Sequence, residues 1–368
     1  MWDVIVAGAG PAGAVAAFVL ARNGHHVLLA DRPGSCTPRT GEALPGAAVQ
    51  LLRSLDLPAP CMGGPHTPIG GNFTSWGIDA LLATDFVCEI SGRGWRLDRQ
   101  LFDRELRAAA IEKGVTFREA QVCDLQRDGA HWQVRFGDGA METARWLLDA
   151  TGRRAFVARR LGAKRLRYAP ALVALYGMSS QMSHLQLDRT LIEAVPAGWW
   201  YAARLPAGAA IAGFHTDARE ASRLKADPER WKQQLRSTRH ISAALGDVEF
   251  ASLARPVDAG SARLPEFAGE GWAACGDAAM SVDPISGQGI FFALLGGHLA
   301  GDAIMQALQE GGCQPVHTYS ARMERTWKAY DARWRSIYRS ERRWLDQPFW
   351  RAHQHGNCRE TYASLKAG

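Results

Sequence analysis

The first 31 residues carry the pattern that most constrains the fold. An apolar run, Val4 to Val6, leads into glycines at 8, 10 and 13, then a helix-compatible stretch and a second apolar run ending on Asp31. This order predicts a parallel βαβ unit whose helix begins at a pyrophosphate, with the acid placed to bind a ribose hydroxyl. The unit predicts dinucleotide contacts at Gly8, Gly10, Ala12, Gly13, Asp31 and Arg32.

A second glycine-rich loop lies far down the chain. Residues 271–295 read GWAACGDAAMSVDPISGQGIFFALL, a short apolar strand, a Gly-Asp pair, a loop and the start of an apolar helix. Loops of this composition ahead of a helix present backbone N–H groups to a negative group. The two loops therefore need either one long ligand that touches both or two separate ligands.

The two loops together resemble the paired FAD fingerprints of the para-hydroxybenzoate-hydroxylase superfamily. The resemblance implies that Asp277 binds a ribityl hydroxyl of FAD and that the second loop meets the flavin. Similar family segments imply that Arg39 reaches the pyrophosphate, that Arg99 begins a cofactor-binding helix, and that Val122 contacts adenine through its backbone. The implied contacts in the second loop are Asp277, Pro284, Gly287, Gln288, Gly289 and Ile290. FAD is expected to be non-covalent, since no His or Cys occupies an obvious attachment position.

The expected fold class is α/β, a doubly wound Rossmann-like FAD domain with an interleaved β-sheet substrate domain and a helical C-terminus. The expected boundaries are 1–60, 95–165 and 265–310 for the FAD domain, 61–94 and 166–264 for the substrate domain, and 311–368 for the C-terminal segment. In the superfamily such a sheet covers the flavin, which makes Trp76, Tyr201 and His215 candidates for substrate contact or for the core. Glu42 and His66 are the candidate titratable catalytic groups; Glu42 can equally anchor its loop, and His66 can be solvated.

The segment Asp149-Ala-Thr-Gly152 departs from the Asp-Gly motif of typical aromatic hydroxylases, which is tied to NAD(P)H. With GWWYAARLP at 198–206 and the pair Gly41-Glu42, it resembles the tryptophan-halogenase-like branch. Many members of that branch take reduced flavin or electrons from elsewhere, so an external electron donor or flavin reductase is expected. The halogenases that this branch resembles carry a Lys for halogenation in the segment before the Arg99 helix, and residues 61–99 contain none. Oxygenation is therefore expected rather than halogenation.

The C-terminal stretch WRSIYRSERRWLDQPFWRAH, residues 334–353, resembles the end of flavoproteins that oxygenate a protein tryptophan while maturing tryptophylquinone cofactors. A stripe at helical spacing predicts packing on the FAD domain; its members are Met323, Trp327, Tyr330, Trp334 and Ile337. The sequence thus predicts an FAD-dependent monooxygenase that hydroxylates a Trp of a partner protein or peptide. Three alternatives stay open: a hydroxylase of a free small aromatic, a flavin reductase like the geranylgeranyl reductases, and a non-catalytic FAD-binding partner protein.

Charge and composition restrict the remaining classes. The net charge is +6, and from Tyr319 onward there are 11 Lys and Arg against 5 Asp and Glu. This concentration does not match a uniformly basic nucleic-acid binder. Seven Cys without a CxxC pair and eleven His without an HExxH pattern predict no metal. No run approaches 18 apolar residues and the N-terminus enters a strand directly, so no membrane span and a cytoplasmic location are expected.

Overall fold

The computed structural model describes residues 1–34, 41–86, 90–182, 188–253, 255–355 and 360–361. Its first sheet has a parallel centre in the order β21-β11-β1-β2-β8, with β20 antiparallel at one edge and the hairpin strands β10 and β9 attached to β11. The strands are β1 (Trp2–Ala7), β2 (Val27–Ala30), β8 (Thr116–Arg118), β9 (Val122–Asp128), β10 (His131–Phe136), β11 (Met141–Asp149), β20 (Ala268–Gly269) and β21 (Trp272–Ala274).

Parallel pairing buries the centre of this sheet on both faces, as its apolar strands require. Val4 pairs with Val27 on one side and with Trp146 on the other, and Val4 and Val27 are fully buried. The crossover helix α1 (Pro11–Arg22) begins directly after the first glycine-rich loop. The expected βαβ unit is therefore present, although β1 is longer than the apolar run Val4 to Val6.

The second sheet is mostly antiparallel, in the order β17-β13-β16-β15-β14-β5-β6, with β18 paired to β13. Only the β14–β5 pair within this described order is parallel. The strands are β5 (Gly71–Ser75), β6 (Leu82–Asp85), β13 (Val173–Met182), β14 (Arg189–Val195), β15 (Gly198–Arg204), β16 (Ala209–Thr216), β17 (Phe250–Leu253) and β18 (Val257–Asp258).

Two smaller sheets join the halves of the molecule. One has the order β3-β7-β4, from β3 (Ala43–Leu44), β7 (Gly94–Arg96) and β4 (Thr67–Ile69). The other has the order β22-β19-β12-β23, from β22 (Met280–Ser281), β19 (Ala262–Arg263), β12 (Leu166–Arg167) and β23 (Glu360–Thr361). The C-terminal segment, expected to be helical, thus also contributes a short strand.

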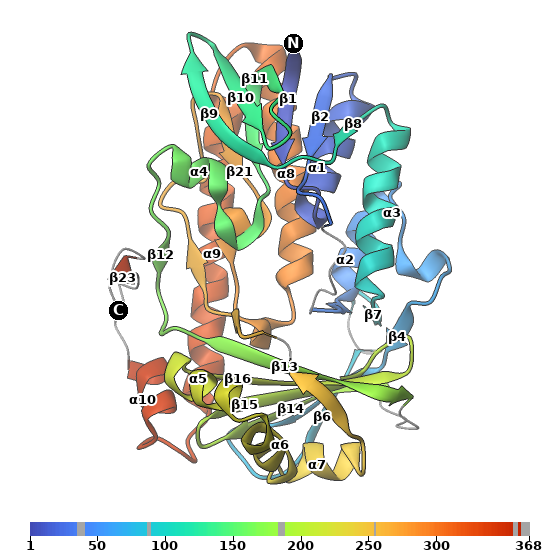
Figure 1. Ribbon diagram of the computed structural model, residues 1–368, viewed down its shortest axis with the longest axis vertical. Helices are drawn as coiled ribbons and strands as arrows, with labels where there is room; N and C mark the ends of the chain where they lie inside the picture. Colours follow the sequence, from blue (N-terminus) through green and yellow to red (C-terminus); the bar gives the residue numbers. More distant parts are fainter. Residues whose placement is uncertain (35–40, 87–89, 183–187, 254, 356–359, 362–368) are drawn as a thin grey trace.

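The helices divide between the two large sheets, which lie at opposite ends of the molecule (Figure 1). α9 runs from the level of the first sheet to the second sheet, where α10 lies, while α5, α6 and α7 cover the far face of the second sheet. The remaining bounds are α2 (Gly46–Ser54), α3 (Arg99–Glu112), α4 (Phe156–Arg160), α5 (Ala218–Ala226), α6 (Pro228–Arg236), α7 (His240–Leu245), α8 (Gly289–Glu310), α9 (Gln314–Ser340) and α10 (Pro348–His355).

Alternation along the strands gives the second sheet two apolar faces. Trp200 and Phe214 pack with α5–α7 in one cluster, whereas Trp199 and Tyr176 belong to the large cluster that also holds β1, α8 and α9. Because successive side chains point to opposite faces, neighbours such as Trp199 and Trp200 serve different cores. The face that carries Trp199 is therefore turned toward the first sheet.

α8 is long and apolar enough to cross a membrane, by length and composition alone. More than half of its most apolar 18-residue stretch, 56%, is buried inside the protein, and α8 packs in the large core cluster. Its apolarity is explained by this packing against α1 and α9, so it is a core helix.

Most predicted elements lie where the sequence placed them, and two boundaries differ. The apolar stripe of α9 ends on the fully buried Tyr338 rather than on Ile337, which is only partly buried. The sequence predicts one helix rich in Lys and Arg from Pro228 to Arg239, but α6 ends at Arg236. The Thr238 hydroxyl then accepts from Ser242 N at 2.9 Å, at the start of the next helix, α7.

Candidate active site

The first cofactor loop needs glycine for a steric reason. Gly8 has φ +106°, and a Cβ added there would lie 2.2 Å from the Ala150 carbonyl oxygen. α1 begins at Pro11 with Gly10 as its N-cap and no capping side chain. Backbone N–H groups of the first turn therefore have no side-chain acceptor, the arrangement that binds a pyrophosphate.

The acid at the end of β2 lies against this loop, as predicted. Asp31 Oδ2 accepts from Ala9 N at 3.2 Å, and its Oδ1 accepts from Arg32 N at 2.8 Å. The predicted contact residues thus lie together at the carboxyl ends of β1 and β2, namely Gly8, Gly10, Ala12, Gly13 and Asp31. The side chain of Arg32 is exposed. Val122 begins β9 and packs against the core cluster that contains Ala30.

The second loop is brought to the first by the packing of α8 on α1. A Cβ added at Gly276 would lie 2.7 Å from the Ala12 Cβ, so the Gly-Asp turn touches the first turn of α1. Pro284 to Gln288 lie in the loop before α8, and Gly289 and Ile290 form its first residues. The N-cap Gln288 makes no side-chain cap, so the amides at the start of α8 also lack a side-chain acceptor.

Two arginines that sequence reasoning missed hold the Gly-Asp turn. Arg153 Nε lies 3.5 Å from Asp277 Oδ2, and the Asp277 side chain is 40% exposed. Arg165, which is 4% exposed, donates to the Asp277 carbonyl at 2.7 Å and to the Arg153 carbonyl at 2.9 Å. Arg153 belongs to the Gly-Arg-Arg sequence after β11, but nothing in that sequence indicates its partner.

Arg39 was predicted to reach the pyrophosphate from the segment before α2, and Arg99 was predicted to begin a cofactor-binding helix. Arg99, the first residue of α3, donates to the Gly41 carbonyl at 2.6 Å and pairs with Asp103 at 3.3 Å. It therefore holds the chain that leads into β3. Arg39 lies outside the described residues, so its predicted role stays a prediction.

Glu42 and His66 lie at the small sheet β3-β7-β4 and form contacts that anchor it. Glu42 is 3% exposed, with its Oε1 3.7 Å from Arg96 Nη1 and its Oε2 accepting from Gly41 N at 3.0 Å. His66 is buried rather than solvated, and its Nδ1 accepts from Asp98 N at 3.0 Å. The structure gives both residues an anchoring contact, and their catalytic roles stay predictions.

The face of the second sheet turned toward the first sheet is aromatic. Trp199 and His215 stack with ring centroids 3.6 Å apart and planes 2° apart, and Tyr176 Oη is hydrogen-bonded to His215 Nε2 at 3.1 Å. Burial lowers the pKa of His215 to about 3, which keeps its ring neutral. Tyr201 lies on the same face, where its hydroxyl accepts from Arg96 at 3.3 Å.

Trp76 reaches this aromatic face from the loop after β5. Its ring lies 6.4 Å from that of Trp199 and 5.7 Å from that of Tyr338, and its Nε1 donates to the Ile337 carbonyl at 2.8 Å. The structure therefore brings Trp76 and His215 to the same side chain, Trp199, which sequence reasoning did not single out. Trp199 lies two residues before Tyr201 in GWWYAARLP, so alternation along the strand could have placed it on the same sheet face as that candidate.

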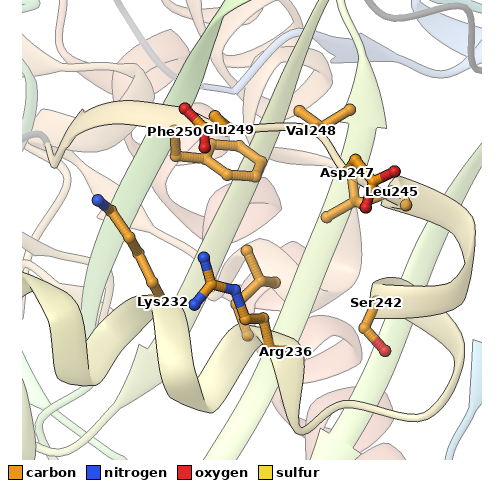
Figure 2. Close-up of a pocket in the computed structure, with 10 residues that line it drawn as sticks. Lys232, Arg236, Ser242, Leu245, Asp247, Val248, Glu249 and Phe250 are labelled. Atoms are coloured by element: carbon orange, nitrogen blue, oxygen red, sulfur yellow. The ribbon is translucent and has the colours of Figure 1, made fainter.

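A separate hollow of about 210 Å³ lies on the far face of the second sheet, between α6, α7 and the start of β17 (Figure 2). Its polar lining includes Lys232, Arg236, Ser242, Asp247 and Glu249. The sheet separates this hollow from both cofactor loops, so it is not part of the candidate site. Within the described ranges, no three His, Cys, Asp or Glu side chains gather in a way that could hold a metal ion.

The chain is similar to several FAD-dependent proteins. The relative from Marinomonas mediterranea named FAD-dependent oxidoreductase LodB is 29% identical over 95% of this chain and 96% of its own length. The solved structure of the myxobacterial chondrochloren halogenase CndH has a TM-score of 0.85 at 23% identity, covering 96% of this chain and 86% of that one. The structure of QhpG, a peptidyl tryptophan dihydroxylase essential for tryptophylquinone cofactor biogenesis, has a TM-score of 0.72 at 26% identity, covering 96% and 78%.

The sequence profile of the tryptophan halogenase family matches residues 87–367, well over half of the chain. The two helix N-termini without capping side chains, the acid beside the first loop and the close approach of the two loops fit one extended FAD molecule. The protein is thus an enzyme, an FAD-dependent oxidoreductase with non-covalent FAD, and the chain belongs to the tryptophan halogenase family.

Proposed function

We propose that the protein is a monooxygenase that hydroxylates an electron-rich aromatic ring, and that this ring is a Trp side chain of a partner protein or peptide. The observation that carries the proposal is the aromatic sheet face beside the second cofactor loop. Trp199 on that face donates to Tyr338 at 3.1 Å, and Tyr338 donates to Asp283 of the loop at 2.8 Å. A flat aromatic substrate held there would lie beside the flavin end of the cofactor.

FAD, once reduced, supplies the electrons that activate dioxygen, and one oxygen atom enters the ring while the other leaves as water. The chain supplies position and electrostatics. The amides at the start of α8 stabilise negative charge on the reduced cofactor. The neutral His215 and its stacked Trp199 are each 1% exposed, so they form a dry, uncharged layer behind the proposed position of the substrate ring.

The choice of a protein tryptophan rests on the similarity to QhpG, which is described as a peptidyl tryptophan dihydroxylase. The absence of Lys from residues 61–99 supports oxygenation over halogenation. An external flavin reductase or electron donor completes the proposal, since the Asp-Gly motif tied to NAD(P)H is replaced. Stopped-flow mixing with NADPH alone should then reduce the bound flavin poorly; rapid reduction would contradict an external donor.

The test is turnover under ¹⁸O-labelled dioxygen with a reductant that supplies reduced flavin, a Trp-containing protein or peptide as substrate, and chloride or bromide present. Mass spectrometry should show the label on the Trp ring. A halogen on the ring would make the protein a halogenase. Label that enters only a free small aromatic would favour the small-molecule hydroxylase. Saturation of a C=C bond without label would favour the reductase, and no turnover with any of these substrates would favour a non-catalytic role; each of these four results overturns the proposal.

A further inference from the structure

Asp283 opens the second cofactor loop and is almost fully buried, with 2% of its surface exposed. Its Oδ1 accepts from Ile285 N at 2.9 Å, within the loop. Its Oδ2 accepts from Trp334 Nε1 at 2.9 Å and from Tyr338 Oη at 2.8 Å. The carboxylate is therefore held by three neutral donors, two of which come from the C-terminal helix α9.

A third residue of α9 binds the same aspartate through its backbone. Tyr330 Oη accepts from Asp283 N at 2.8 Å. Tyr330, Trp334 and Tyr338 are spaced by four residues, which places them on successive turns of one helix face. All three are nearly buried, at 7%, 3% and 0% exposed. We call these three residues and Asp283 the α9 clamp.

Packing alone does not explain this choice of side chains. Phe or Leu at the three helix positions would bury as much apolar surface without bringing a polar group into the core. Here the polar atom of each of the three side chains contacts Asp283, and Tyr330 Oη is also hydrogen-bonded to Ser261 Oγ at 2.5 Å. The helix face therefore has a second task besides covering the FAD-binding half of the molecule, which is to fix one residue of the cofactor loop.

Tyr338 also connects the clamp to the substrate-facing sheet. Its hydroxyl accepts from Trp199 Nε1 at 3.1 Å while it donates to Asp283. Trp199 in turn stacks on His215 of the neighbouring strand β16. One hydroxyl group thus joins the cofactor loop, the C-terminal helix and the aromatic sheet face.

The clamp matters because a buried carboxylate is unstable without donors. Burial raises the pKa of Asp283 above its ordinary value, and its hydrogen bonds with Ile285, Trp334 and Tyr338 offset only part of that rise. Removing one donor leaves part of a buried charge unsatisfied, which costs more than an exposed hydrogen bond.

We propose that Trp334 and Tyr338 are positioning residues that act through Asp283, and that they hold the second cofactor loop in its FAD-binding geometry before FAD binds. This inference rests on FAD binding alone, and it holds whether the enzyme hydroxylates or halogenates its substrate. It gives the C-terminal helix a direct role in cofactor binding.

The test is a double-mutant cycle on FAD affinity, with Tyr338→Phe, Asp283→Asn and the double variant. The dissociation constant of FAD is measured by flavin fluorescence on the full-length apoprotein, together with the visible spectrum of bound flavin. Tyr338→Phe should weaken FAD about five- to twentyfold, by loss of one hydrogen bond to a buried charge. In the Asp283→Asn background the same change should weaken FAD less than about twofold, because the two residues act as one unit.

Tyr319→Phe is the matched control. Tyr319 lies on the same helix, is 3% exposed and donates one hydrogen bond, at 2.6 Å to the Ala274 carbonyl. The Tyr319→Phe variant should have a melting temperature lowered to a similar extent as that of Tyr338→Phe, and its affinity for FAD should change less than about twofold. Equal FAD loss in the two variants, or the same loss from Tyr338→Phe with and without Asp283→Asn, would overturn the proposal.

A second variant covers the case in which Asp283→Asn fails to fold. Trp334→Phe keeps an aromatic ring in the core and removes only the indole N–H that reaches Asp283. It should weaken FAD severalfold and alter the flavin spectrum in the same direction as Tyr338→Phe. Normal affinity with an unchanged spectrum would contradict the inference without any use of the Asn variant.

Discussion

The two cofactor loops differ in where their support comes from. The first loop is held by its own neighbourhood, since Asp31 lies 22 residues from its partner Ala9. The second loop is held from a distance, by Trp334 and Tyr338, 51 and 55 residues from Asp283, and by Arg165, 112 residues from Asp277. A loop supported locally is specified by a short motif, whereas a loop supported from elsewhere depends on the whole fold.

The sharpest way to break the first loop is Gly8→Ala. The added Cβ would meet the Ala150 carbonyl at 2.2 Å while the residue keeps φ +106°. We expect the variant to lose about 3 kcal/mol or more of stability and to bind no FAD, because clash and backbone strain add. Thermal unfolding and flavin fluorescence measure both effects.

Gly139→Ala is the control for Gly8→Ala, because Gly139 has φ +88° with open space around its Cβ position. Backbone strain at residue 139 without a steric clash should lower the free energy of unfolding by about 1 kcal/mol, and the variant should still bind FAD. Similar losses in the two variants would mean that the close approach of Gly8 to β11 does not matter.

Removal of the acid in the second loop has the next largest effect. Asp277→Ala should weaken FAD by about 1.5–3 kcal/mol, the range for a hydrogen bond to a charged group. Asp277 is half-exposed and paired with Arg153, so the fold itself should lose little stability. An isothermal titration with FAD gives the affinity. A fully retained affinity would contradict the predicted ribityl contact.

Acid should destabilise the aromatic sheet face. Burial holds the pKa of His215 at about 3, below its ordinary value of 6.5, so the unfolded chain binds more protons than the folded one between these values. Stability therefore falls as the pH is lowered from 6.5 toward 3. Between pH 6.5 and 4, His215 should contribute about 1–3 kcal/mol of this loss.

His215→Phe tests the acid prediction, because it keeps a ring over Trp199 and removes the titrating group. Its melting temperature should depend less on pH than that of the unchanged protein. The buried His353, with its pKa lowered to about 4, should leave a residual slope in both. If the melting temperatures of the two proteins depended on pH equally, His215 would bind the same number of protons in the folded and the unfolded state, which would contradict the prediction.

The smallest expected effect concerns docking of a protein substrate at the C-terminal end of α9, on Arg339 in its last turn and Arg342 just after it. Arg339 and Arg342 are exposed, whereas Arg343 is turned inward, with ion pairs to Glu341 at 2.6 Å and Asp79 at 2.7 Å. Arg339→Glu with Arg342→Glu should keep FAD bound and slow oxygenation of a protein substrate severalfold at low salt. Rates measured at low and high salt check this.

Arg322→Glu with Arg325→Glu provides the matched control for docking. Both residues are exposed on the same helix, toward its other end, so the charge change is equal. Equal slowing in the two double variants would show an effect of net charge alone. Loss of FAD after Arg339→Glu and Arg342→Glu would instead assign these residues a structural role.

Much of the fold was predictable because the sequence patterns that indicate its strands and helices span only a few neighbouring residues. The βαβ unit, the β10–β11 hairpin and the strands of the second sheet follow from glycine placement and from apolar patterns of period two. The end of α6 at Arg236 was missed because a second helix, α7, begins at His240, so the two helices look like one in the sequence. Arg153 and Arg165 were missed because their partners lie far along the chain and no spacing connects them.

The sequence by itself determined the two cofactor loops, their order and the apolar stripe of α9, since each of these depends on residues close together in the chain. Only the tertiary structure decided what the stripe does. Packing alone would have required any large apolar side chains at Tyr330, Trp334 and Tyr338, but the fold carries Trp334 and Tyr338 to one buried carboxylate and Tyr330 to the backbone N–H of the same residue, Asp283. Hydrogen bonds require precise placement of two partners, and that placement across 51 and 55 residues comes from the assembled core rather than from any local pattern.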